Sequence, residues 1–240
     1  MKEVRNLMLI VLSLAITGCV NGQIRKTVYG NGNVVKKERT ADTPFTGVST
    51  SSAIDIMLTQ GDKYSIEVEA DENLHEYIMT EVKGNTLEVY TDANIREAKT
   101  RRVYVTMKNI NYVGSSSAGD VIGLTPVKTD NLKITVSSAG DVKLEVYAGK
   151  IGADVSSAGD LTLSGEADML DASLSSAGDL NAFMLKVREA DVSASSNGDA
   201  DIWVTEKLTA HASSAGDVNY KGDPESVDAH SSSAGGVHKR

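Results

Sequence analysis

Apolar and polar residues alternate with a period of two through most of the C-terminal half of the chain. Leu132, Ile134 and Val136 are apolar, whereas the residues between them are Lys and Thr. The segments 151–155 and 170–174 repeat the same alternation. Because successive side chains of a strand point to opposite faces, this pattern predicts β-strands with one buried face. We therefore expect an all-β protein built from half-buried strands.

A short motif, usually Ser-Ser-Ala-Gly-Asp, separates one alternating segment from the next. Its last residue recurs at Asp120, Asp141, Asp160, Asp179, Asp199, Asp217 and Gly236. The steps between these positions are 21, 19, 19, 20, 18 and 19 residues. A fixed period near twenty residues indicates one structural unit stacked on itself. Small residues allow close approach of backbones at a bend, and we expect the glycine of the motif to accept the left-handed backbone there.

Each unit reads as a strand, the Gly-Asp corner, a second strand and a second turn. One such unit cannot bury its apolar face alone, but copies stacked in register bury it continuously. Extended chain at ~3.3 Å per residue gives each unit a contour of about 60 Å, and stacked units would lie ~4.8 Å apart. The sequence therefore predicts a parallel β-helix with coils of about 19 residues. A propeller needs roughly 40 residues per blade, and the leucine-rich pattern is absent.

Residues 40–113 carry strands without the regular spacing. The segment 51–55 reads as a degenerate first copy of the corner, and 72–81 as a short helix or an irregular cap. Terminal units of stacked-repeat proteins are usually atypical. We therefore expect irregular coils that close one end of the β-helix and form one continuous domain with the regular repeats of 114–240.

Residues 1–18 have the pattern of an export signal. Lys2 and Arg5 precede an apolar run that is too short to span a bilayer. The run ends in Ile16-Thr17-Gly18-Cys19, which resembles a bacterial lipobox. This resemblance implies cleavage before Cys19 and acylation of its thiol. The alternative is an ordinary export signal followed by a chance cysteine.

Residues 19–39 are expected to be the lipidated cysteine and a tether. Acyl chains, at ~0.8 kcal/mol per buried methylene, would make the membrane a permanent partner. We expect the cell envelope, at the outer membrane, with the periplasmic or surface side left open. The formal net charge of −9 argues against nucleic acid as a partner.

The repeated Asp of the corner is the first candidate for chemistry. Stacked carboxylates could bind Ca²⁺, which prefers oxygen ligands. The nine-residue calcium-binding repeat is absent, however, and an Asp that accepts N–H groups of its own turn explains the motif. We expect a structural role for these residues and no cofactor.

Four residues on one strand face form a second candidate. His211 and His230 occupy the same place in adjacent units, with Asp191 and Asp228 two positions earlier in theirs. Two imidazoles and two carboxylates could hold Zn²⁺. A solvated face that binds no metal is the plainer interpretation.

Trp203 and a basic cluster are the remaining candidates. Trp203 lies between two apolar residues, so the alternation directs it outward, where it could contact a sugar or a protein, or be covered by a neighbouring coil. The segment 96–102 holds four basic residues that could recognise an anionic glycan or form a solvated loop. No carboxylate pair of the kind that glycosidases use can be singled out among 33 acidic residues.

Several motifs together resemble one known family. They are Ser-Ala-Ile-Asp-Ile at 52–56, Gln-Gly-Asp at 60–62, Val-Glu-Ala-Asp-Glu-Asn at 68–73 and the Ser-Ser-Ala-Gly-Asp ladder. Over residues 40–236 the chain resembles the head GIN domain family, the auto-transporter adhesins of Bacteroidetes-type bacteria. The resemblance implies a single-stranded, right-handed parallel β-helix on a lipoprotein or secreted chain. It supplies no catalytic residues.

These observations lead to one expected function with two alternatives. We expect a lipid-anchored cell-envelope protein that is not an enzyme and whose β-helix is an adhesive interaction surface. Its partner would be a glycan or a protein of the cell envelope. One alternative is a β-helix that binds or degrades polysaccharide, and the other is a structural envelope spacer.

Overall fold

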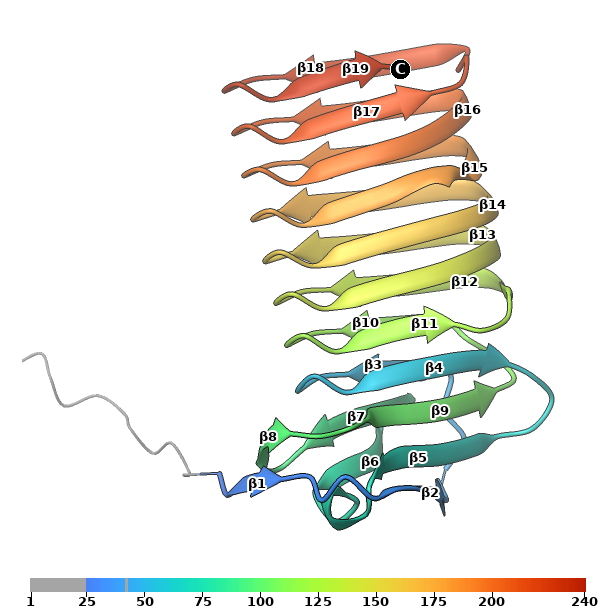
Figure 1. Ribbon diagram of the computed structural model, residues 1–240. Coiled ribbons are helices and arrows are strands. Elements are labelled where there is room, and N and C mark those ends of the chain that lie inside the picture. Colours follow the sequence, from blue (N-terminus) through green and yellow to red (C-terminus); the bar gives the residue numbers. More distant parts are fainter. Residues whose placement is uncertain (1–24, 42) are drawn as a thin grey trace, which may run out of the picture.

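The computed structural model describes residues 25–41 and 43–240, which form an elongated β-solenoid (Figure 1). Seventeen strands join in one continuous sheet, and two more form a small separate sheet. Within the described residues no helix is long and apolar enough to cross a membrane. The export signal and Cys19 lie outside the described residues. The prediction of an all-β parallel β-helix is confirmed.

The regular part of the solenoid begins after residue 111. Its strands are β10 (Tyr112–Ser115), β11 (Asp120–Gly123), β12 (Val127–Val136), β13 (Asp141–Ser156), β14 (Asp160–Ser175), β15 (Asp179–Ala194), β16 (Asp199–Ala212), β17 (Asp217–Lys221), β18 (Ser226–Ser231) and β19 (Gly236–Lys239). Strands β13 to β16 each continue around the second bend, so one strand makes almost a whole coil. In Figure 1 the chain runs left to right in front, returns behind and climbs, which makes the coil right-handed.

Neighbouring coils pair in parallel and in register. Asp141 lies beside Asp160, and Asp160 beside Asp179, so each corner stacks directly on the next. This register follows from the constant spacing of the motif, because a slip by one residue would turn every apolar side chain outward.

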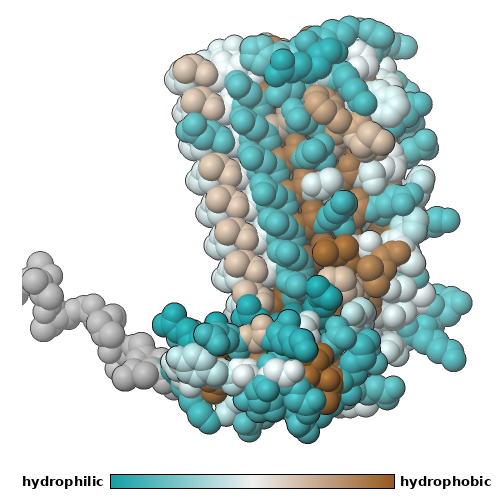
Figure 2. Space-filling model, in the orientation of Figure 1, coloured by the Kyte–Doolittle hydropathy of each residue, from teal (hydrophilic) through white to brown (hydrophobic). Residues whose placement is uncertain are grey.

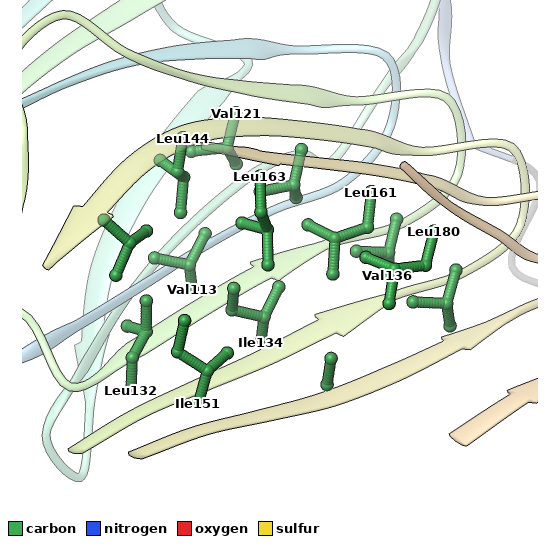
Figure 3. Packing of buried hydrophobic residues seen from close by; sticks show 14 of the residues in the cluster. Val113, Val121, Leu132, Ile134, Val136, Leu144, Ile151, Leu161, Leu163 and Leu180 are labelled. Atoms are coloured by element: carbon green, nitrogen blue, oxygen red, sulfur yellow. The ribbon is translucent and has the colours of Figure 1, made fainter. Parts of the chain in front are cut away.

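The core is a thin layer between the outgoing and the returning halves of each coil. Leu161 and Leu163 of the outgoing half face Ile134 and Ile151 of the returning half (Figure 3). All four side chains are fully buried. Full burial of such a side chain contributes about 1.5–3 kcal/mol. Stacking therefore supplies the stability that a single coil lacks.

The N-terminal part places its strands in a different arrangement. Its strands are β1 (Thr27–Tyr29), β2 (Val34–Arg39), β3 (Gly47–Thr50), β4 (Asp55–Gln60), β5 (Ser65–Asp71), β6 (Ile78–Lys83), β7 (Thr86–Thr91), β8 (Asn94–Glu97) and β9 (Arg101–Met107). Strands β3 and β4 stack in parallel on β10 and β11, so the first coil begins there. Below them, β5 pairs antiparallel with β2 and β9, and β6 pairs antiparallel with β7. These antiparallel strands close the end of the solenoid.

Two expectations for this part are corrected. Residues 27–39 contain β1 and β2, which pair with β8 and β5, so much of the expected tether of 19–39 belongs to the fold. Of the two alternatives for 72–81, a short helix or an irregular cap, the helix is reduced to a single 3₁₀ turn, Glu72–Leu74, which is followed by β6. A tight turn at Gly84, with φ of 61°, folds β6 back onto β7 and fixes it as a strand.

The corner backbone also differs from the expectation. Ser117 and Ala118 have φ of 52° and 58°, and the equivalent pair is left-handed in all eight copies, whereas the glycine of the motif is not. The glycine is needed for the close approach of backbones, which is the other expectation for the small residues of the motif. A Cβ added at Gly178 would lie 2.7 Å from backbone atoms of the preceding coil. Each left-handed alanine before the last corner donates its N–H to the next coil, as Ala118 does to the Ser138 carbonyl at 3.1 Å.

Candidate functional site

The corners form straight columns along one edge of the solenoid (Figure 2). The Asp column is held by contacts between coils. The Asp217 N–H donates to Asp199 Oδ1 at 3.0 Å, and the Asp199 N–H donates to Asp179 Oδ1 at 3.3 Å. The expected bond to the residue's own turn is therefore replaced by one to the next coil, because in-register stacking brings that N–H within reach.

The electrostatics of this column oppose its stacking. Partial burial raises the pKa of the Asp120, Asp141 and Asp160 carboxyls, and the carboxylate of the preceding coil raises each of them further. No group of three or more His, Cys, Asp or Glu side chains within residues 25–41 and 43–240 is placed to hold a metal ion. The carboxylates of the column therefore repel one another mildly.

The structure brings together some of the residues considered for Zn²⁺. The rings of His211 and His230 stack at 5.3 Å with an interplanar angle of 7°. Asp228 Oδ1 lies 3.1 Å from His230 Nε2. Asp191 pairs instead with Thr209, which separates it from Asp228 by a whole coil. The four residues therefore do not form one cluster.

A bulge interrupts the regular stacking between β15 and β16. The coil that starts at Asp179 has 20 residues before the next corner Asp, and the following coil has 18. Ala182 pairs with Ile202 and Lys186 pairs with Trp203, so residues 183–185 have no partner in β16. Bulges redirect side chains and are frequent at functional sites. Here the bulge leaves the Met184 side chain 70% exposed.

Trp203 lies beside this bulge, partly exposed on the outer face of the outgoing half-coils. Lys186 and Lys221 stand on the coils either side of it, in register. The Lys221 Nζ lies 4.5 Å from the centre of the Trp203 ring and 5.7 Å from that of Phe183, and the Lys186 Nζ lies 5.9 Å from Trp203. Cation–π contacts at exposed sites contribute about 0.5–1 kcal/mol. We call Phe183, Met184, Lys186, Trp203 and Lys221 the aromatic–lysine patch.

The backbone next to the patch is built for close approach. Gly222 has a φ of 102°, and an added Cβ would collide with the carbonyl oxygen of Val204 and lie 3.2 Å from Trp203 Cδ1. Because residue 222 is a glycine, the chain can turn at the end of β17 in close contact with the Trp203 ring. The place of Lys221 above the ring depends on this turn.

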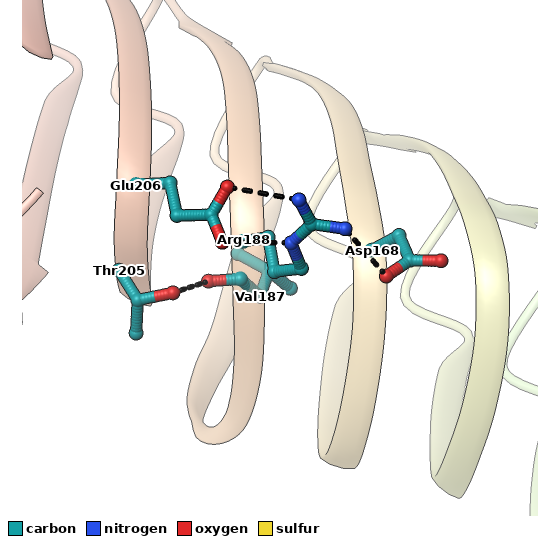
Figure 4. A network of polar contacts seen from close by, with 5 residues as sticks. All are labelled: Asp168, Val187, Arg188, Thr205 and Glu206. Atoms are coloured by element: carbon teal, nitrogen blue, oxygen red, sulfur yellow. Dashed lines mark hydrogen bonds and ion pairs between the residues drawn. The ribbon is translucent and has the colours of Figure 1, made fainter.

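A shallow groove of about 390 Å³ adjoins the patch at the second bend, with Lys186 in its wall. Arg188 crosses the groove region and links three coils (Figure 4). Its Nε donates to Glu206 Oε1 at 2.7 Å, and its Nη1 donates to Asp168 Oδ1 at 3.4 Å. The hydrogen bond from Arg188 lowers the pKa of Glu206. Arg188 is therefore committed to acidic neighbours, whereas Lys186 is not.

A second hollow, of about 510 Å³, lies where the N-terminal cap meets the first coils. Its cations already have partners. The Lys83 Nζ donates to Glu88 Oε2 at 2.7 Å, and Arg25 Nη1 donates to the Thr91 carbonyl at 3.4 Å. The basic segment 96–102 is split between β8 and β9, with Arg102 paired beside Asp55. Lys83 and Arg25 are therefore less available to a ligand than the two lysines of the patch.

The sequence points to Trp203 but not to the rest of the patch. In the spacing of the motif, the steps of 20 and 18 residues are the only sign of the patch. The two lysines lie 35 residues apart in the chain and belong to no common motif, and only the register of the coils brings them to the same ring. The unequal steps therefore indicate the bulge, but nothing in the sequence indicates that Lys186 and Lys221 meet at Trp203.

Comparison with known proteins agrees with the fold. Residues 44–224 match the family model described as "Putative auto-transporter adhesin, head GIN domain". A "putative adhesin" from Bacteroides fragilis superposes with a TM-score of 0.82 at 23% identity, covering 89% of this chain and 100% of that one. Another "putative adhesin", from Parabacteroides merdae, superposes with a TM-score of 0.74 at 26% identity, covering 90% of this chain and 99% of that one.

A "putative lipid binding protein" from Parabacteroides distasonis gives a TM-score of 0.72 at 23% identity, over 90% of this chain and 100% of that one. No curated protein matches the chain. At such identities the structural likeness shows a shared fold, and the family match covers most of the sequence. The chain therefore belongs to the head GIN domain family.

Proposed function

We propose that this protein is a lipid-anchored adhesin of the cell envelope and that its β-helix is a non-catalytic interaction surface. The observation that carries the proposal is the in-register stacking, which repeats like groups coil after coil on the outside. Asp141, Asp160 and Asp179 are one such column. Repeated groups favour polyvalent contact, in which many weak contacts act together. The family of adhesins to which the chain belongs supports the same function.

The fold also suits an N-terminal anchor. β1 lies at the capped end of the solenoid, and the regular coils extend away from it (Figure 1). An anchor at Cys19 would stand six residues before Arg25, the first described residue. The cap would then lie nearest the membrane, and the coils would point outward. Such an arrangement presents the long faces of the solenoid to a partner.

A binding screen on the chain from residue 20 tests this function, since it retains every described element. Immobilised envelope and host polysaccharides and immobilised envelope proteins are probed for saturable binding, and each polysaccharide mixture is assayed for new reducing ends. We expect binding without new reducing ends. New reducing ends would support a polysaccharide-degrading protein, whereas binding to no polysaccharide and to no envelope protein would support a spacer.

The anchor is tested separately with Cys19→Ala in the full chain. We expect wild-type protein in the detergent-rich phase of a Triton X-114 separation and labelling by radioactive palmitate. The variant should lose the palmitate label, because the acylated thiol is gone. Equal labelling of both proteins would overturn the lipid anchor.

A further inference from the structure

We propose that the aromatic–lysine patch binds an acidic glycan, meaning a polysaccharide whose pyranose rings carry carboxylate groups. This inference rests on the proposed adhesive function and gives it a site and a class of ligand.

The first argument concerns charge. The chain has a formal net charge of −9, and Lys36, Lys83, Lys133, Lys150 and Lys239 form ion pairs with acidic side chains. Within the described part of the chain, Lys186 and Lys221 form no ion pair and rest over aromatic rings instead. A flexible lysine can leave a ring for a carboxylate with little penalty, since the charge-assisted bond is the stronger contact. The patch therefore offers two available cations on an acidic molecule.

The second argument concerns shape. Both ammonium groups lie within 6 Å of the same indole, at 4.5 and 5.9 Å from its centre. A ligand packed against Trp203 is thus within reach of both. The C–H face of a pyranose packs well on an aromatic side chain, and Phe183 and the exposed Met184 extend the apolar area. A ligand with both a ring and an acid group satisfies the patch, whereas a small inorganic anion uses only the lysines.

The third argument concerns extent. Lys186 lines both the patch and the groove of about 390 Å³ at the second bend. A polymer that begins on Trp203 can continue into this groove. The Thr205 hydroxyl there donates to the Val187 carbonyl and the Tyr147 hydroxyl donates to Glu145, so both oxygens can still accept hydrogen bonds from sugar hydroxyls. A membrane surface fits less well, because the patch lies several coils from the capped end that an N-terminal anchor would hold at the membrane.

Trp203 is the only tryptophan of the chain, so its fluorescence reports directly on the patch. The chain from residue 20 is titrated with polygalacturonate, with fully methyl-esterified polygalacturonate and with vesicles of phosphatidylglycerol. We expect a saturable change with polygalacturonate, and at least tenfold weaker apparent affinity for the esterified polymer, which keeps the rings but lacks the charge.

Variants separate the site from general electrostatics. Lys186→Gln with Lys221→Gln should weaken polygalacturonate binding at least tenfold. The matched control, Lys143→Gln with Lys207→Gln, removes two exposed lysines elsewhere and should bind like the wild type. Far-UV circular dichroism melts check that both are folded.

Any of four results would overturn the proposal. Trp203 fluorescence could show no saturable change with polygalacturonate, or the chain could bind the esterified polymer with equal affinity. The control pair could lose as much affinity as the Lys186 and Lys221 pair, or the fluorescence could respond to the vesicles alone. None of these results touches the screen or the anchor test above, so the adhesive function could stand while this site fails.

Discussion

Two residues with side chains take the left-handed conformation at every corner, a serine followed by an alanine or, in one copy, by Asn197. For L-residues this conformation costs about 1–2 kcal/mol each. It persists because it points the alanine N–H at the next coil, as from Ala139 to the Ser157 carbonyl at 3.1 Å. The strain is therefore balanced by hydrogen bonds that exist only in the stack. At each bend, the left-handed residues therefore direct an N–H to the next coil, and the glycine lets the backbones of adjacent coils approach closely.

Because the glycine and the left-handed alanine of the corner have different roles, two small substitutions there should have unequal effects on stability. Gly178→Ala should lower the free energy of unfolding by about 1–3 kcal/mol, since the new Cβ meets backbone of the preceding coil at 2.7 Å. Ala177→Gly should change it by less than about 1 kcal/mol, because relief of strain is offset by backbone entropy. Urea denaturation of both variants measures the difference. The reverse order would contradict the assigned roles.

The Asp column predicts a pH-dependent gain from removing one charge. Burial first, and Asp120 second, raise the pKa of Asp141 in the folded state above its unfolded value. The ionised carboxylate is therefore destabilising at neutral pH, and this penalty is relieved as pH falls through the folded pKa towards the unfolded value of about 3.9. Asp141→Asn should raise the melting temperature at pH 7 and show no gain at pH 3.

The control for this prediction is Asp130→Asn, an exposed acid at the second bend. It should leave the melting temperature nearly unchanged at both pH values. A gain for Asp141→Asn that persists at pH 3 would show that the effect does not come from the charge.

At the scale of the strand, alternation decides which face is buried. Leu170 in β14 is fully buried, with Ile151 and Ala190 beside it in the neighbouring coils. Leu170→Asp should abolish the cooperative thermal transition of several coils, because it buries an unpaired charge. Met169→Asp changes the adjacent outward position of the same strand and should melt like the wild type. A cooperative, wild-type melt of Leu170→Asp would contradict the inward assignment.

The strands also show why sequence predicts some elements and not others. The regular coils were predictable because alternation and corner spacing agree at every repeat. The cap was not, since a short alternating segment such as β2 does not reveal that its partner β5 runs antiparallel. The patch depends on a length difference between two neighbouring coils, which shifts register only locally. Its lysines meet at Trp203 through pairing between coils, which no single segment encodes.

At the scale of the whole molecule, each coil contacts chiefly the coils on either side. The solenoid is therefore quasi-one-dimensional, and its stability is a sum over similar units and their interfaces. Its outer faces are correspondingly repetitive, apart from the bulge of β15 and the cap. A solenoid of this kind can vary in length without losing its architecture. The specialised patch would then sit on a scaffold that tolerates change elsewhere.

Excision of one complete coil tests this account most directly. Deleting residues 142–160 from the chain that starts at residue 20 joins Asp141 to Leu161, which lies in register with Val142 and so takes its place. We predict a folded protein with one cooperative melt. Trp203 should keep its fluorescence response to a ligand that the wild type binds at the patch, because the patch lies on later coils, although the deletion removes Tyr147 from the adjoining groove. An unfolded or molten product would contradict the claim that the molecule is a stack of interchangeable coils presenting a repeated surface.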